Sequence, residues 1–257
     1  MVLPDDAPTY HMYSPDHAYN EEMRKQGSEW LEDGLSRVPA GVKANGHLIA
    51  AESVSEGLIA EAEDSSKGGG AGLIVVGTSH HFRLGSIADE LLHSSTVPVA
   101  LAPSEYEDQP AITRITCATG VREGHDVLLK FAIHAAAEWK VPLRLMSLVA
   151  VGEDGPEERR QEWSELAQMH INTLAEKAAE VLPPECPVTT VVGHGDTLVD
   201  AVNALEFADS EIVMVGSSRL AQPRRLFIGR TATKLMRLLT VPMIVVPRDY
   251  DPDEISG

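Results

Sequence analysis

The chain has 257 residues and a mass of 27.7 kDa, with 43% apolar and 23% charged residues, which excludes a disordered chain and a small disulfide-held scaffold. A formal net charge of −18 argues against general binding to nucleic acid or to anionic lipid. No apolar run reaches the roughly 18 to 20 residues that cross a bilayer, and residues 1–5 lack the basic flank of a signal peptide, so we expect a cytoplasmic protein.

Short apolar and β-branched runs in the first part of the chain predict strands, and the stretches between them predict helices. Ser53 precedes Glu56 by three residues, which is the spacing of a capping box at a helix start. In chain order we expect the end of a strand at 1–4, a helix at about 20–35, a strand at 48–51, a helix at 54–64, and strands at 73–76 and 97–102.

A polar segment bounded by prolines, residues 104–110, is typical of a linker, and we place a domain boundary near residue 108. The remainder alternates β-branched strands with helices, which predicts a parallel five-stranded sheet with helices on both faces. Thr197 and Asp200 also have the spacing of a capping box. The strands expected are 112–118, 142–149, 188–192, 212–215 and 241–246, and the helices are 125–139, 157–182, 198–208 and 231–239.

The two parts of the chain share one pattern. Apolar runs end at Gly77 and Gly216, and each is followed by a second glycine, Gly85 or Gly229, that precedes an apolar strand by twelve residues. This indicates a duplication, so the predicted fold class is α/β with two tandem, doubly wound parallel-sheet domains, 1–107 and 108–257. The first repeat lacks counterparts of the first strand and first helix. Because that strand is central to such a sheet, we expect that residues precede Met1 in the natural protein or that another chain or segment fills the gap.

A parallel strand that ends in Gly216, Ser217 and Ser218, followed by a loop and by Gly229 at a helix start, places backbone N–H groups around a phosphate. At these residues the chain resembles the universal stress protein family, in a tandem form with two domains in one chain. The resemblance implies an adenine-nucleotide alpha-hydrolase-like fold and a role in the stress response. It covers nearly the whole chain apart from the missing start.

The family's nucleotide-binding motif is a glycine, two residues, a glycine, nine residues, a glycine and then serine or threonine. Gly216 and Gly229 keep the required separation, whereas Arg219 takes the place of the middle glycine and Arg230 that of the final hydroxyl residue. Gly120 stands where the resemblance implies an aspartate that contacts adenosine. In the first repeat, Gly77 and Gly85 are five residues too close, which predicts a truncated loop there.

The resemblance therefore implies at most one degenerate site for ATP or a related nucleotide, in the second repeat, with Mg²⁺ as the only metal. Seven basic residues and no acidic residue lie between 212 and 248, which favours an anion there, although an empty or structural site stays open. We expect phosphates near Gly216, Ser217, Gly229, Arg230 and Thr231, ribose near Ser218, and adenine near Ala118, Thr119 and the strand around Ser147 to Val149; Gly120 and Arg219 are the remaining residues expected in the site.

Other motifs are weak. Gly193 and Gly195 lack the third glycine of a dinucleotide fingerprint, and we interpret them as a turn before a capped helix. His80, His81 and the two cysteines, Cys117 and Cys186, have no metal-ligand spacing. The sequence contains no nucleophile elbow and no Walker loop, so we predict no catalytic residues and at most weak ATP hydrolysis.

The preferred hypothesis is a binding or regulatory protein of the stress response whose signal depends on occupancy of that site. The alternative is a structural interaction or dimerisation module with no bound nucleotide. The apolar strands at 97–102 and 241–246 should form the edges of their sheets, where exposed strands invite pairing. The family resemblance implies that these strands pair, so we predict a pseudo-dimer within one chain, which then forms a homodimer.

Overall fold

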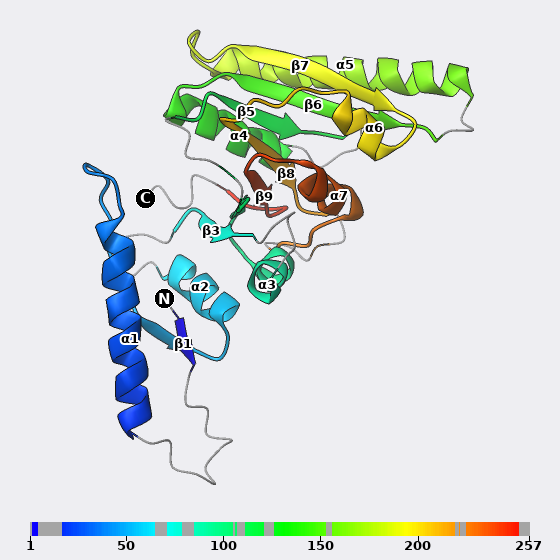
Figure 1. Cartoon of the computed structure of the whole chain (residues 1–257). Helices are drawn as coiled ribbons and strands as arrows, with labels where there is room; N and C mark the ends of the chain where they lie inside the picture. The colour runs from blue at the N-terminus through cyan, green and yellow to red at the C-terminus, as the bar shows by residue number, and fades with distance from the viewer. Residues whose placement is uncertain are drawn as a thin grey trace.

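The computed structural model describes residues 2–4, 17–64, 71–78, 85–104, 106, 111–120, 126–152, 156–218, 221 and 225–251 (Figure 1). The predicted elements of the first repeat are all present, and a further helix follows Gly85. They are β1 (Val2–Pro4), α1 (His17–Ser36), β2 (Ile49–Ala51), α2 (Val54–Glu63), β3 (Ile74–Gly77), α3 (Ser86–Ser94) and β4 (Val99–Ala102).

The second repeat contains the five strands and four helices that the sequence predicts. They are β5 (Arg114–Ala118), α4 (Asp126–Trp139), β6 (Leu143–Ala150), α5 (Glu157–Val181), β7 (Val188–Gly195), α6 (Leu198–Asn203), β8 (Glu211–Gly216), α7 (Arg230–Leu238) and β9 (Met243–Val246). β4 and β9 begin later than predicted, each directly after a proline, Pro98 or Pro242, which has no N–H to donate. The interpretation of Gly193 and Gly195 as a turn is wrong, because both glycines are paired in β7.

Seven strands form one sheet in the order β3-β4-β9-β8-β5-β6-β7. The five strands of the second repeat are parallel, with β5 in the middle, as a sheet wound outward from its first strand requires. β4 pairs with β9 in the antiparallel direction, Leu101 opposite Met243, so the last strands of the two repeats meet within the chain. The fold is thus α/β, with a mostly parallel sheet.

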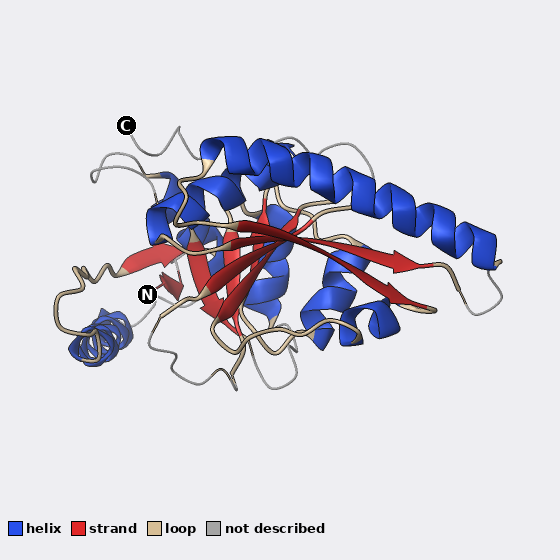
Figure 2. Ribbon diagram, turned by 90° about the horizontal axis from the view of Figure 1, so that it is seen from above, coloured by secondary structure: helices blue, strands red, loops and turns tan. Residues whose placement is uncertain are grey.

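Helices cover both faces of this sheet (Figure 2). Two clusters of buried apolar side chains lie between the sheet and the helices. Alternate residues of β8 divide between them: Val213 and Val215 pack on the side of α3 and α7, and Met214 packs on the side of α4 and α5. This division follows from the two-residue period of a strand, and it explains why strands buried on both faces are apolar throughout.

The described strands of the first repeat form two separate parallel pairs. β1 pairs with β2 and β3 pairs with β4, both in parallel, but among the described residues no strand pairs with both β1 and β3. In the second repeat the corresponding strands, β6 and β8, flank β5. The boundary near residue 108 adjoins residues that lie outside the described ones, and the division into 1–107 and 108–257 stays a prediction.

A buried ion cluster joins the amino ends of the central strands. The side chain of Glu211, at the start of β8, has no exposed surface and accepts hydrogen bonds from Arg114, Thr116 and Arg144, the last at 2.7 Å. The Glu211 carboxylate also accepts a hydrogen bond from the backbone N–H of Ala208 at 3.1 Å. Ala208 lies outside α6, because this helix ends at Asn203, earlier than predicted. The cluster lies at the opposite end of the strands from their carboxyl ends, where ligands bind in parallel sheets.

Candidate functional site

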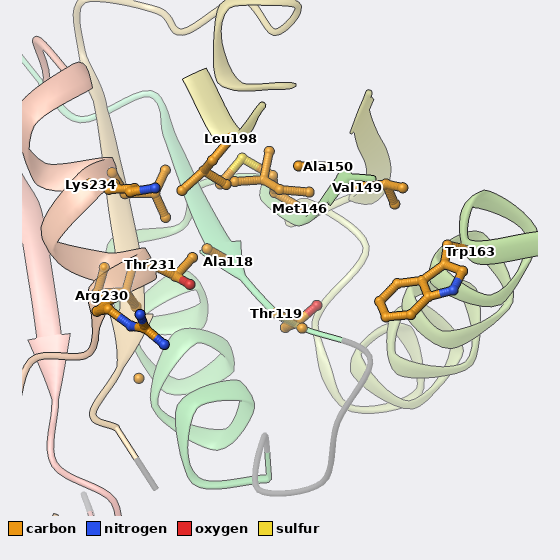
Figure 3. A pocket seen from close by; sticks show the side chains of 16 residues that line it. Ala118, Thr119, Met146, Val149, Ala150, Trp163, Leu198, Arg230, Thr231 and Lys234 are labelled. Carbon is orange, nitrogen blue, oxygen red and sulfur yellow. The ribbon is translucent and has the colours of Figure 1, made fainter. Parts of the chain in front are cut away.

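A cavity of about 520 Å³ opens at the carboxyl ends of β5, β6 and β8. It lies where the strand order reverses around β5, which is the usual position of ligand sites in open parallel sheets. Its walls come from the ends of these strands, from α5, and from the first turns of α6 and α7 (Figure 3). The lining residues are Ala118, Thr119, Gly120, Met146, Leu148, Val149, Ala150, Trp163, Leu198, Val215, Gly216, Arg230, Thr231, Ala232, Lys234 and Leu235.

Thr119 lies in the middle of this cavity, one residue beyond β5. Its backbone N–H donates to the carbonyl of Met146 at 2.8 Å, which fixes the residue against β6. Its side-chain hydroxyl is buried and has no hydrogen-bond partner among the described residues. A buried hydroxyl without a partner is costly, and a polar ligand group in the cavity would satisfy it.

The start of α7 forms a cationic wall. Gly229 is the N-cap and supplies no side chain to cap the helix, so the first N–H groups of α7 have no side-chain partner from that residue. Arg230 and Lys234 are exposed and line the cavity on the same side, and no acidic residue lies in the first turn of α7 (Figure 3). The positive end of the helix and these two side chains favour a bound anion.

The loop before α7 is held by bonds within the chain. The Ser217 hydroxyl accepts the N–H of Phe227 at 2.9 Å, and the N–H of Ser218 donates to the carbonyl of Phe227 at 2.7 Å. The next N–H groups, of Leu226 and Ile228, donate to the carbonyls of Ser95 and Leu92 at the end of α3. The first repeat therefore anchors the loop that precedes the cationic wall.

The structure brings most of the predicted site residues together. Seven line the cavity: Ala118, Thr119, Gly120, Val149, Gly216, Arg230 and Thr231. Arg219 lies outside the described residues.

Ser147, Ser217, Ser218 and Gly229 are not among the residues that line the cavity, and the roles expected for them stay predictions. Ser147 is buried in β6, between Met146 and Leu148, two residues that do line the cavity. Ser217 and Ser218 are held by the loop bonds just described. Gly229 lies next to Ser218: a Cβ built on Gly229 would be 3.4 Å from the Cβ of Ser218.

Sequence reasoning missed Trp163 and Lys234. Lys234 follows Arg230 by four residues on one helix, a spacing that puts both on the same face and that could have indicated it. Trp163 gave no signal, because its helix is far from the glycine motif in sequence. Arg160 fixes this part of α5: it donates to the carbonyl of Gly152 at 2.9 Å and forms an ion pair with Asp196.

The described residues contain no group of three or more His, Cys, Asp or Glu side chains that could hold a metal ion. Both cysteines are buried as free thiols, and burial raises the pKa of Cys117 to about 12, so this thiol is not a nucleophile at neutral pH.

No helix in the described ranges is long and apolar enough to cross a bilayer.

The sequence from residue 111 to residue 247, more than half of the chain, matches the model of the universal stress protein family. The chain belongs to the universal stress protein family. The match covers the second repeat, which contains the cavity, and the cavity is built from the strand ends and the helix start that carried the resemblance.

Relatives of similar length support the assignment. Universal stress proteins of Mycobacterium tuberculosis and Mycobacterium bovis are 27% identical over 244 residues, which covers 89% of this chain and 81% of theirs. The solved structure of a universal stress protein from Archaeoglobus fulgidus has a TM-score of 0.59 at 22% identity, covering 96% of this chain and 84% of that one. A putative universal stress protein from Pseudomonas aeruginosa has a TM-score of 0.54 at 18% identity, covering 99% and 83%. These two structures show the shared fold.

Proposed function

We propose that this universal stress protein is a cytoplasmic regulatory protein of the stress response that binds ATP or a related nucleotide in the cavity of its second repeat. The observation that carries the proposal is the composition of that cavity. One end is apolar, the middle holds the buried hydroxyl of Thr119, and the other end is the cationic start of α7. A nucleotide has the same order of groups: an apolar base, a hydroxylated sugar and a polyanion.

The phosphates would contact Arg230, Thr231 and Lys234, and the hydroxyl of Thr119 would contact the ribose. The base would enter between Ala118 and Val149. Beyond Met146, β6 continues beside β7 to Ala150 while β5 has ended, so the backbone of these last residues is available to the edge of a base. Gly120 supplies no carboxylate, and Mg²⁺ would accompany the phosphates of the nucleotide rather than bind to protein ligands.

The proposal predicts that the nucleotide is released when the purified protein is denatured, and that millimolar ATP with Mg²⁺ raises the melting temperature of the nucleotide-free protein. Replacing both cavity cations, Arg230→Gln with Lys234→Gln, should weaken ATP binding at least about tenfold, because charge-assisted contacts to phosphate are lost. Isothermal titration calorimetry measures this.

Arg237→Gln is the matched control, since Arg237 is exposed on the same helix but does not line the cavity. It should leave ATP affinity within about twofold. Equal losses in the two proteins would mean that ATP responds only to the general charge of α7. No released nucleotide and no thermal shift would favour a structural interaction module instead.

A second proposal concerns assembly, and the antiparallel contact of β4 with β9 supports it. We propose that the two repeats form a pseudo-dimer around this contact and that two chains form a homodimer. Sedimentation velocity of the full chain should then show a species of twice the 27.7 kDa chain mass. A single species at the chain mass over a wide range of protein concentration would exclude the homodimer and leave the internal pairing as it is.

A further inference from the structure

Trp163 continues the buried stripe of α5 beyond the hydrophobic core. Ala167 and Ile171 follow it at intervals of four residues on the same face of the helix, and both are fully buried against the sheet. Trp163 itself is 47% exposed. The apolar side of α5 therefore extends past the end of the hydrophobic core, and Trp163, the residue at that position, lines the cavity.

The indole lies opposite the cationic wall. Figure 3 shows Trp163 at one side of the cavity, Arg230 and Lys234 at the other side, and Thr119 between them. Val149, which is buried at the end of β6, is the apolar residue labelled nearest the indole in this view. The other two tryptophans, Trp30 and Trp139, do not line the cavity.

The part of α5 that carries Trp163 is held by bonds of a neighbouring residue. Arg160 is one turn earlier on α5, and its bonds to Gly152 and Asp196 hold the helix start against the ends of β6 and β7. The backbone N–H of Gly152 in turn donates to the carbonyl of Asp196 at 2.9 Å. A large aromatic ring is thus held at the mouth of a cavity, where a flat ligand ring could cover its exposed surface.

We infer that Trp163 is the residue on which the aromatic base of the ligand stacks, so that this side chain, rather than the carboxylate missing at Gly120, supplies the affinity for the base. The inference rests on the proposed function, because it needs a nucleotide in this cavity. The two ends of the site then act on different parts of the ligand: α7 binds the polyanion and α5 binds the base. Stacking of a base on an aromatic side chain needs no hydrogen bond to the base edge.

The test compares two probes, ATP with Mg²⁺ and inorganic tripolyphosphate with Mg²⁺, by isothermal titration calorimetry of the full chain. Trp163→Ala should weaken ATP binding roughly 5- to 100-fold, the range for the loss of one stacked base, and leave tripolyphosphate binding unchanged. Trp163→Phe should retain most of the ATP affinity. Trp139→Ala, which removes an exposed tryptophan outside the cavity, should not change the binding of either probe.

A spectroscopic measurement does not depend on the alanine variant being folded. Because the chain has three tryptophans, Trp30→Phe with Trp139→Phe leaves Trp163 as the single one. Its fluorescence should fall on saturation with ATP and stay constant with tripolyphosphate. ATP affinity that is unchanged in Trp163→Ala, or ATP binding without a change in this fluorescence, would overturn the stacking role and leave the proposed function intact. A wild-type protein that binds neither probe would overturn both.

Discussion

Replacement of Glu211 with alanine should lower the free energy of unfolding by about 3 to 5 kcal/mol, the cost of removing one partner from a buried ion pair. Burial lowers the pKa of the Arg144 guanidinium, and the Glu211 carboxylate opposes this shift. Without the carboxylate, Arg144 is desolvated with no counter-ion, while Arg114, whose side chain is 30% exposed, is able to turn to water. Urea denaturation monitored by circular dichroism measures the loss.

Two further proteins test the cause of this loss. Asp33→Ala removes an ion pair with Arg37 in which both side chains are exposed, and it should cost no more than about 1 kcal/mol. Replacement of the buried pair together, Glu211→Leu with Arg144→Met, should recover most of the stability, because no unpaired charge then remains inside. A double variant as unstable as Glu211→Ala would show that the hydrogen bonds of the cluster, rather than its unpaired charge, decide the stability.

Gly195→Ala should destabilise the protein by about 2 to 3 kcal/mol, since a Cβ at this position would lie 2.4 Å from the backbone nitrogen of Ala201 and 2.5 Å from the Cβ of Asp200. The atoms nearest to it belong mainly to the helix backbone, so α6 would have to move as a unit. The capping box of Thr197 and Asp200 fixes the start of that helix. The midpoint of urea denaturation should fall accordingly.

Gly77→Ala is the matched control, because Gly77 also ends a strand, yet nothing lies within 4 Å of a Cβ built there. It should leave the stability unchanged or raise it by a few tenths of a kcal/mol through the reduced freedom of the unfolded chain. Equal losses of stability for Gly195→Ala and Gly77→Ala would show that the ends of these strands require the backbone freedom of glycine, and that the close approach of α6 is not the cause.

The sequence predicted the strand positions, the central place of β5 and the capping box at Thr197 well, because these depend on local patterns: apolar runs, a two-residue period and the residues that begin helices. It also predicted Arg230 as a residue of the site because Arg230 adjoins the glycine motif, and Arg230 lines the cavity. Of the capping box predicted at Ser53 and Glu56, the structure contains one bond: the Ser53 side chain accepts a hydrogen bond from the backbone N–H of Glu56.

The rest of the site depends on register and on distant segments. The family resemblance implies Ser147 near the base, whereas the residues of β6 that line the cavity are Met146, Leu148, Val149 and Ala150. Ser217 was assigned to phosphate, yet its hydroxyl holds the loop to Phe227. Trp163 reaches the cavity because β6 and α5 extend past β5. The lengths of these two elements are predicted from the sequence, but the place of Trp163 beside β5 depends on contacts between segments that are distant in the chain.

The contact between β4 and β9 has a consequence for synthesis of the protein. Leu101 and Met243 face each other across it, so β4 leaves the ribosome more than a hundred residues before its neighbour exists. Val99 and Leu101 have no exposed surface in the finished fold, but until then they belong to an open apolar edge of a nascent chain. Translation pauses in the second half should therefore increase aggregation of the stalled first half.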